Sequence, residues 1–312
     1  MKRTARFWDW SAPAERLALT RVLVGAFASI YLLASTRDLL SAIDFSPRQL
    51  VPVGLTSWLS APLPPWLVVA SVVLVVATGL LFTLGLAFTY SAPLFALSLL
   101  WVTTYRSSWG MIFHTDNLLT LHVLLLALSP AADVWSLDAR RRLQQGSALP
   151  HEPDARYGWA LRAMSVVTVV TYALAGVAKL KLAGSTWFDG ELLRAQIAYD
   201  NLRKIELGTR VSPLGPWLVR HHGVFRALAL ATLVVELGAP LALVRPRIAA
   251  AWAVLAWGFH VSVLLMMSIA FPYQLCGVAY ASLFPVERAW AWGRAMARAR
   301  LPRAAGRAGP DA

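Results

Sequence analysis

Residues 66–105 read WLVVASVVLVVATGLLFTLGLAFTYSAPLFALSLLWVTTY, and the charge-free run around them extends from Arg48 to Arg106. One helical crossing of a bilayer needs about 20 apolar residues, so this run is long enough for two. Each crossing must be a helix, because lipid offers no hydrogen-bond partner to a bare backbone amide. The stretch therefore predicts a membrane protein built from helices.

The composition of the whole chain agrees with this prediction. Its 312 residues are 58% hydrophobic and 14% charged, with 14 Trp and 12 Phe. Soluble domains carry about 25% charged residues, and disordered chains have few apolar residues, so neither class fits. The single cysteine, Cys276, excludes an internal disulfide and a thiolate metal cage. We expect no bound metal.

The hydropathy pattern predicts an all-α polytopic bundle of about eight transmembrane helices. The eighth is the weakest, because it is short and opens with Phe271-Pro272-Tyr273; it could instead be re-entrant. The expected spans are residues 17–35, 66–84, 88–105, 117–133, 158–178, 225–244, 248–268 and 271–286.

The basic residues predict the orientation. With the N-terminus in the cytoplasm, 16 of the 29 Lys and Arg fall on the cytoplasmic side, as the positive-inside rule requires. Both termini are then cytoplasmic, and the chain is a multi-pass protein of the bacterial plasma (inner) membrane. The net charge of +13 reflects anchoring to the lipid bilayer, so we expect no nucleic-acid partner.

The segments outside the lipid indicate one transmembrane domain, residues 1–296. We expect outer loops at 36–65 and 179–224, and an amphipathic helix at 189–204 within the second loop. The tail, residues 297–312, is rich in Ala, Arg, Gly and Pro and is expected to be a disordered basic cytoplasmic segment.

Lys179 is the first polar residue that needs an explanation at membrane depth. Tyr172, Ala175, Gly176 and Lys179 share one helix face, where the small residues allow a ligand or helix to approach closely. A lysine withdrawn from water can serve as a base. The alternative is that its side chain extends to the outer interface.

Four further residues each have a functional and a structural interpretation. His114 lies beside Asp116 and Asn117, with which it would form a hydrogen-bonding cluster. Alternatively, Thr115, Asp116 or Asn117 would cap the start of a helix. His260 is either functional or a satisfied core histidine, whereas His122 has the weaker claim of an interhelical hydrogen bond. Glu236 could pair with Lys179, with Arg21 or with a substrate. His114, Lys179 and His260 are all expected near the outer face, which suggests one site.

Several short motifs follow one another in a fixed order between about residues 11 and 290. Together they resemble the vitamin K-dependent gamma-glutamyl carboxylase and its bacterial relatives, the HTTM (horizontally transferred transmembrane) family. The motifs are Ser107-Ser108-Trp109 with His114, Trp135-Ser136-Leu137-Asp138, Tyr172 through Leu180, Trp187-Phe188-Asp189-Gly190, and Phe259-His260 with Ser268 through Tyr273.

The resemblance implies a quinol-oxygenating site on the extracytoplasmic side, with reduced vitamin K or another quinol as the cofactor. Lys179 takes the place of the family's proposed base, and His114 and His260 would orient or stabilise the oxyanion and the glutamate. If catalytic, the protein is a vitamin K-dependent carboxylase-like enzyme, a carbon–carbon lyase or quinol epoxidase. The expected substrate or quinone pocket comprises Tyr172, Gly176, Trp109, Asn117, Glu236 and Tyr273.

Two departures from the carboxylase leave other functions open. Ala178 replaces the first of the family's paired lysines, and the chain ends soon after its last expected span, where the carboxylase has a large lumenal domain. Carboxylation would then need a separate substrate-docking protein. The alternatives are a non-enzymatic membrane factor for maturation, export or immunity of a secreted peptide, and a quinone-binding subunit of a redox complex.

Overall fold

The computed structural model describes residues 10–300, and all of its regular elements are helices. Within these residues the chain forms no β-strand, which confirms the all-α prediction. The α-helices are α1 (Ala14–Ala34), α2 (Thr36–Leu40), α3 (Pro65–Leu84), α4 (Phe88–Ser107), α5 (His114–Ala127), α6 (Leu137–Gln144), α7 (Ala155–Ala183), α8 (Glu191–Glu206), α9 (Leu214–Leu218), α10 (His222–Leu237), α11 (Pro246–Met267), α12 (Pro272–Leu275) and α13 (Val286–Arg300). The 3₁₀-helices are η1 (Ser41–Ile43), η2 (Pro47–Gln49), η3 (Gly54–Thr56), η4 (Gly184–Trp187), η5 (Ala239–Leu243) and η6 (Val278–Leu283).

Four segments of the described chain are long and apolar enough to cross a membrane. They are Ala14–Ala34, Pro65–Leu84, Ala155–Trp187 and Pro246–Met267. These segments match the first, second, fifth and seventh expected spans. The total of eight spans is not confirmed. The fourth expected span, 117–133, shows why: α5 has 14 residues, or about 21 Å, which is less than the ~30 Å of a hydrocarbon core.

The eighth expected span, residues 271–286, is wrong as a continuous helix. Ser268 ends α11 with a φ of 51°, Pro272 begins a helix of four residues, and Gly277 interrupts the chain again with a φ of 78°. Irregular backbone at membrane depth needs protein around it. Protein surrounds this segment, since Tyr273 and Ala279 are 0% exposed.

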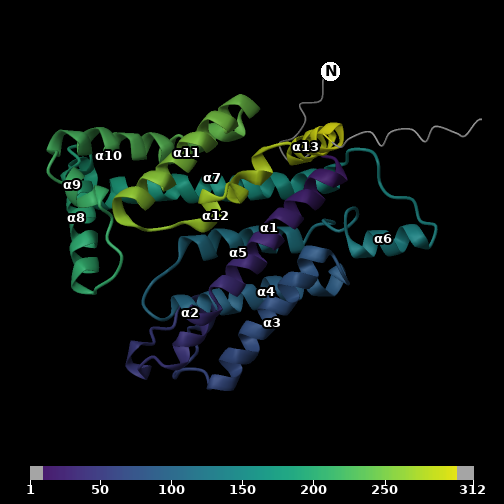
Figure 1. Ribbon diagram of the computed structural model, residues 1–312, viewed down its shortest axis with the longest axis horizontal. Coiled ribbons are helices and arrows are strands. Elements are labelled where there is room, and N and C mark those ends of the chain that lie inside the picture. The colour runs from purple at the N-terminus through teal and green to yellow at the C-terminus, as the bar shows by residue number, and fades with distance from the viewer. Residues whose placement is uncertain (1–9, 301–312) are drawn as a thin grey trace, which may run out of the picture.

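The helices form two halves that share α7. Figure 1 shows α1, α3, α4 and α5 on one side of α7, and α10 and α11 on the other. The first turns of α7 contribute Leu161 and Met164 to the larger core, and its middle contributes Val169 and Tyr172 to the smaller one. The α7 helix therefore belongs to both hydrophobic cores and fixes the position of one half of the molecule relative to the other.

The two ends of the described chain lie at the same end of the molecule. Arg16 near the start of α1 donates to both carboxylate oxygens of Glu287 in α13, at 2.9 and 2.7 Å. The α6 helix lies at this end as well (Figure 1). Helix α13 continues to Arg300, so the first four residues of the predicted disordered tail are helical, and residues 301–312 lie outside the described part. The cytoplasmic location of this end stays a prediction.

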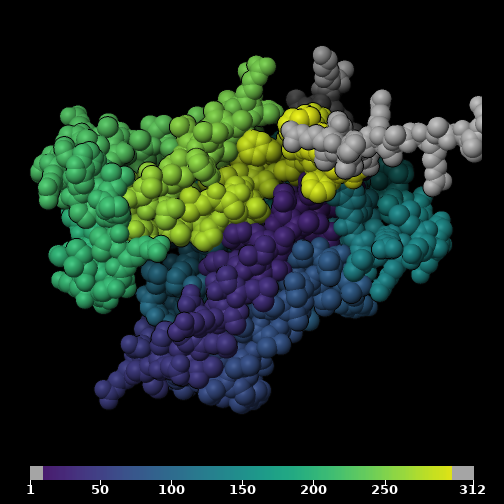
Figure 2. Space-filling view, in the orientation of Figure 1, coloured from purple at the N-terminus to yellow at the C-terminus, as the bar shows by residue number. Residues whose placement is uncertain are grey.

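The predicted amphipathic helix, residues 189–204, is confirmed as α8. In the space-filling view α8 and α9 (green) form a projection separate from the purple segment that follows α1 (Figure 2). The 201–212 region secures the end of α11: Asn201 Nδ2 donates to the Met266 carbonyl oxygen at 3.0 Å. Lys204 and Ser212 donate to the carbonyls of Met267 and Leu265. These bonds satisfy carbonyls that a helix end leaves unpaired.

The segment between α5 and α7 contains a helix and binds the start of α4. It contains α6, and its Asp138 carboxylate accepts hydrogen bonds from the backbone amides of Ala87 (3.0 Å) and Phe88 (2.8 Å). The carboxylate thereby caps the start of α4. Arg21 is fully buried and donates to the Phe82 carbonyl oxygen at 3.1 Å and to that of Trp135 at 2.6 Å. Arg21 therefore joins α1 to this segment and is not the partner of Glu236.

Candidate functional site

A cavity of about 450 Å³ opens between α5, α7, α10, α11 and the segment around α12. All three predicted catalytic residues, Lys179, His114 and His260, line it, as do Tyr172 and Glu236 from the predicted pocket. Its size falls in the range of small-molecule pockets, about 300–1,000 Å³. The remaining lining residues are Thr171, Leu174, Ala175, Phe259, Phe271 and Gln274.

An ion pair between α7 and α10 forms one wall of the cavity. Lys179 Nζ donates to Glu236 Oε1, and the Lys179 side chain is 25% exposed against 3% for Glu236. Gly176 makes this pairing possible, because a Cβ atom there would lie 3.0 Å from Glu236 Cβ and 2.8 Å from Leu237 Cδ2. Gly176 thus brings the helices together and does not itself line the cavity. A carboxylate this buried requires a cationic partner.

A chain of hydrogen bonds forms the deep end of the cavity. The Tyr172 hydroxyl lies 2.6 Å from His260 Nε2 and 2.7 Å from the hydroxyl of Tyr280. All three side chains are buried. Trp252 packs edge-on against Tyr172 with 5.0 Å between ring centroids. Because Nε2 is held by Tyr172, the Nδ1 side of the His260 ring remains for another group.

Two histidines pack against the ring of Phe271. The His260 ring centroid is 4.8 Å from that of Phe271, and the His114 ring stacks on Phe271 at 6.2 Å with an interplanar angle of 18°. His114 is the first residue of α5, and no side chain caps this helix start. The interpretation of Thr115, Asp116 or Asn117 as its cap is therefore wrong.

Three buried polar atoms on lining residues have no hydrogen-bond partner among the described residues. They are Glu236 Oε2, His260 Nδ1 and Gln274 Oε1. Nearly all buried polar atoms in proteins are paired, so such a group of exceptions requires an explanation. The walls between them are apolar, with Leu174, Ala175, Phe259 and Phe271. The cavity thus combines unpaired polar atoms with hydrophobic walls.

The structure separates three predicted pocket residues from this cavity. Tyr273 is fully buried on the other side of α12, where its hydroxyl lies 2.7 Å from His122 Nδ1. Trp109 packs edge-on against Tyr105, with centroids 5.9 Å apart, and does not reach the cavity. Asn117 is exposed on α5 and does not line the cavity either.

Two other polar residues of the sequence analysis have structural partners. His122 also lies 3.0 Å from Thr168 Oγ1, so both of its ring nitrogens are engaged between helices, as its weaker interpretation predicted. Asp116 accepts from the Tyr31 hydroxyl at 2.7 Å and from Arg106 at 3.2 Å. It therefore does not form a cluster with His114.

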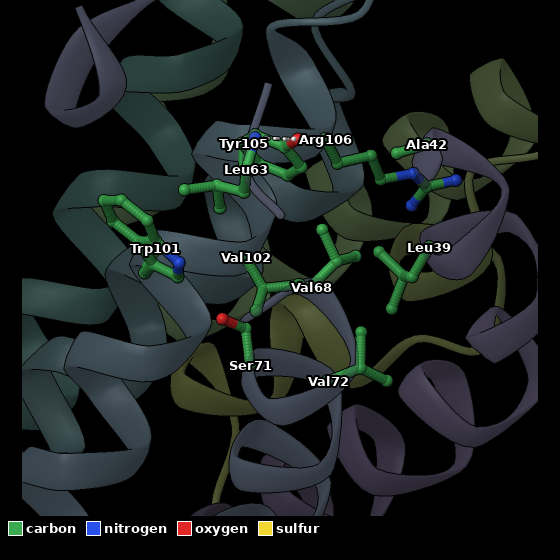
Figure 3. A pocket seen from close by; sticks show the side chains of 10 residues that line it. All are labelled: Leu39, Ala42, Leu63, Val68, Ser71, Val72, Trp101, Val102, Tyr105 and Arg106. Carbon is green, nitrogen blue, oxygen red and sulfur yellow. Dashed lines mark hydrogen bonds between the residues drawn. The ribbon is translucent and has the colours of Figure 1, made fainter. Parts of the chain in front are cut away.

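A smaller cavity near α2, α3 and α4 is too small for a ligand. Its volume is about 20 Å³, space for roughly one water. Figure 3 shows its largely apolar lining, with the hydrogen bond of 3.2 Å from the Leu63 amide to the Tyr105 hydroxyl. It takes no part in the candidate site.

Sequence reasoning missed Phe271, Gln274 and Tyr280. These residues fall in the segment that was expected to be a continuous eighth span, and a continuous helix gives no reason to turn them towards His260. The signal for them was the helix-breaking Pro272 followed by Gly277.

Comparisons with known proteins agree with this arrangement at the level of the family. The profile of the HTTM domain matches residues 11–290. No curated protein and no solved structure gives a significant match to the chain. The match covers most of the sequence and includes every residue that lines the cavity. This chain is therefore a member of the HTTM family, a membrane protein of the carboxylase-associated group.

Proposed function

We propose that this protein binds a quinol in the cavity between α7, α10 and α11 and uses the Lys179–Glu236 pair to accept its proton. One observation carries the proposal: the unpaired Glu236 Oε2, His260 Nδ1 and Gln274 Oε1 all belong to residues that line one largely apolar cavity. A quinol complements such a site, because its flat apolar ring suits the hydrophobic walls and its hydroxyl groups can pair with the polar atoms.

The residues present fit such a ligand. Phe259 and Phe271 line the cavity and provide aromatic surface against which a quinol ring could pack. Gln274 Oε1 and Glu236 Oε2 accept hydrogen bonds from hydroxyl groups, which are donors. A reduced quinol would supply, when bound, the electrons and the acidic hydroxyl required by the family's oxygenation chemistry. Vitamin K-type quinols are the class that the family resemblance favours.

The chain's own groups would handle the proton. Glu236 Oε2 is the free oxygen of a carboxylate whose other oxygen is held by Lys179. A proton taken up at Oε2 leaves the pair with a net positive charge, which stabilises a neighbouring anion. His260, held by its hydrogen bond with Tyr172, would orient the ligand.

The family resemblance also favours a location for this cavity and a specific reaction in it. We assign the cavity to the extracytoplasmic side of the bacterial inner membrane and expect quinol epoxidation by molecular oxygen, in which quinol and O₂ give quinone epoxide and water. The coupled step removes a γ-proton from a glutamate of a secreted peptide, and carbon dioxide adds to the resulting carbanion. A separate docking protein would present the peptide.

Quinol turnover in reconstituted bilayers tests the proposal. Epoxide from vitamin K1 hydroquinone is measured with and without bicarbonate and a glutamyl peptide, for wild type, Lys179→Ala and Glu236→Gln. The matched control is Lys181→Ala, an exposed lysine of the same helix outside the cavity. Because general-base catalysis contributes about 10²–10⁴-fold, both cavity variants should lose at least about a hundredfold, and the control should not change.

The opposite outcome would change the assignment. If folded wild type makes no epoxide from vitamin K1 hydroquinone, menaquinol or ubiquinol, the oxygenase proposal fails. The engagement of Lys179 in an ion pair would then favour the non-enzymatic function, maturation of a secreted peptide, with the pair as a structural link between α7 and α10. Co-purification of a haem, flavin or iron–sulfur protein would instead favour the redox-subunit function.

A further inference from the structure

A second large cavity, of about 410 Å³, lies at the α13 end of the molecule, away from the candidate quinol site. Its lining residues come from the first turns of α1, α11 and α13, from the second and third turns of α7, and from η5 and η6. Four arginines line it, and no Asp or Glu does among the described residues. The four are Arg16, Arg162, Arg245 and Arg288. A concave surface with several guanidinium groups and no carboxylate attracts anions.

We infer that this cavity binds a phosphate-bearing anion, with the headgroup of an acidic phospholipid as its favoured source. Arginine suits this chemistry, because its planar fork of N–H donors matches the oxygens of a phosphate. The inference concerns a different site from the quinol cavity and does not depend on the proposed function.

Trp10 holds two of the arginines in place. The guanidinium carbons of Arg16 and Arg162 each lie 5.3 Å from the centroid of the Trp10 ring. The Trp10 backbone in turn packs directly on α7, where a Cβ atom at Gly158 would lie 1.6 Å from the Trp10 carbonyl oxygen. Arginines positioned in advance lose less conformational entropy when an anion binds.

The start of α11 adds to the positive potential. Arg245 is the N-cap residue of this 22-residue helix and Pro246 its first residue, and both line the cavity. No side chain caps this helix start. The N-terminal end of a helix carries partial positive charge and favours anions.

Part of the positive charge of the cavity, that of Arg245 and Arg288, is uncompensated within the described chain. Arg16 is paired with Glu287, whereas Arg245 and Arg288 are exposed and form no ion pair with any described residue. The buried hydroxyls of Ser165 and Ser282, 3.1 Å apart, provide further polar groups. At least two arginines could therefore bind an anion without first breaking an ion pair with a carboxylate.

The position of the cavity favours a lipid as the source of the phosphate. Arg162 lies in the second turn of α7, seven residues after Ala155, or about 10 Å along the helix. Leu243, Val244 and Leu283 line the cavity beside the arginines. Helices α1, α7 and α11 are all candidate membrane spans, so the cavity lies where spans begin. Basic pockets between transmembrane helices at this level suit acidic lipid headgroups.

Lipid binding by the full-length protein tests the inference with two charge-matched variants. Arg245→Gln/Arg288→Gln removes two cavity arginines. Arg140→Gln/Arg141→Gln removes two exposed arginines of α6, at the same end of the molecule but outside the cavity. Binding is measured by native mass spectrometry and by energy transfer from labelled phosphatidylglycerol in phosphatidylcholine nanodiscs. A third arm adds inorganic phosphate as a competitor.

We expect wild type and the α6 variant to retain phosphatidylglycerol and the cavity variant to bind it about thirtyfold more weakly. If millimolar inorganic phosphate displaces the lipid, or binds in its place in pure phosphatidylcholine, phosphate recognition holds and the source is the soluble anion. Equal weakening in both variants would mean that only general surface charge acts, and would overturn the inference. Failure of folded wild type to retain either anion would overturn it too.

Discussion

Lys179 Nζ donates to one carboxylate oxygen of Glu236, whereas the other oxygen has no hydrogen-bond partner among the described residues. The pair therefore links α7 to α10 and at the same time leaves an unpaired acceptor on a residue that lines the cavity. The structural and functional roles of the pair can be tested separately, because the ion pair uses Oε1 of Glu236 and the proposed proton acceptor is Oε2.

Removal of Lys179 alone should destabilise the protein more than removal of the whole pair. Lys179→Met leaves a nearly buried carboxylate unpaired, for which we expect a loss of about 3 kcal/mol in the free energy of unfolding. The double variant Lys179→Met/Glu236→Met should recover most of this loss, since apolar residues of similar size replace both charges. Thermal unfolding in detergent measures both; simple additivity of the single variants would contradict the expectation.

Removal of the Tyr172 hydroxyl should weaken quinol binding as well as stability. Tyr172→Phe breaks hydrogen bonds to His260 and Tyr280, with a loss of about 1–3 kcal/mol in stability because buried polar atoms lose a partner. The matched control is Tyr273→Phe, which removes an equally buried hydroxyl bound to His122 outside the cavity. Both variants should lower the melting temperature, but only Tyr172→Phe should raise the Kd for a quinol, by about tenfold. An equal effect on Kd would refute the cavity assignment.

Gln274→Leu should have opposite effects on stability and on binding. Its Oε1 is buried without a partner among the described residues, so an apolar replacement of similar shape removes a desolvation penalty and leaves stability unchanged or improved by about 1 kcal/mol. A quinol hydroxyl would lose its acceptor, and its Kd should rise by about tenfold. Melting temperature and quinol titration on the same preparation test this; a lower melting temperature would show that Gln274 supports the fold.

Two glycine substitutions should change stability in opposite directions. Gly158→Ala places a Cβ atom 1.6 Å from the Trp10 carbonyl oxygen, so the N-terminal segment must move, and we expect a loss of at least ~2 kcal/mol. Gly258 in α11 has open space around its Cβ position, so Gly258→Ala should gain up to about 1 kcal/mol through helix propensity. The two melting temperatures should shift apart, and a neutral Gly158→Ala would contradict the packing of Trp10 on α7.

Single-cysteine labelling should determine the orientation. Cys276 is the single native cysteine and can be replaced by Ser. New cysteines at Arg141, in α6, and at Arg210, between α8 and α9, lie at opposite ends of the molecule. In intact cells an impermeant maleimide should label position 210 and leave position 141 unlabelled until the membrane is permeabilised. The reverse pattern would place the candidate quinol cavity in the cytoplasm.

The convergence of Lys179, His114 and His260 was predictable from the sequence, because long apolar segments fix which ends of helices meet. Glu236 was among the expected partners of Lys179 for the same reason. Tyr273 does not line the cavity, whereas its neighbours Phe271 and Gln274 do. Tyr273 belongs to a helix of only four residues, and in so short a helix the sequence spacing does not indicate which side chains face the cavity. Trp109 and Asn117 were grouped with His114 by proximity in sequence, yet Trp109 packs against Tyr105 before α5 begins, and Asn117 is exposed on α5.

The three side chains that hold the last carbonyls of α11, Asn201, Lys204 and Ser212, belong to a segment that contributes no residue to the cavity wall. Those carbonyls stand only a few residues before Phe271. A shortened version of the protein that deletes residues 191–215 would retain every ligand-facing group and yet lose the anchor that fixes where the chain leaves α11. For protein engineering, residues 191–215 are therefore needed to hold the end of α11 in place, although they contribute no residue to the cavity.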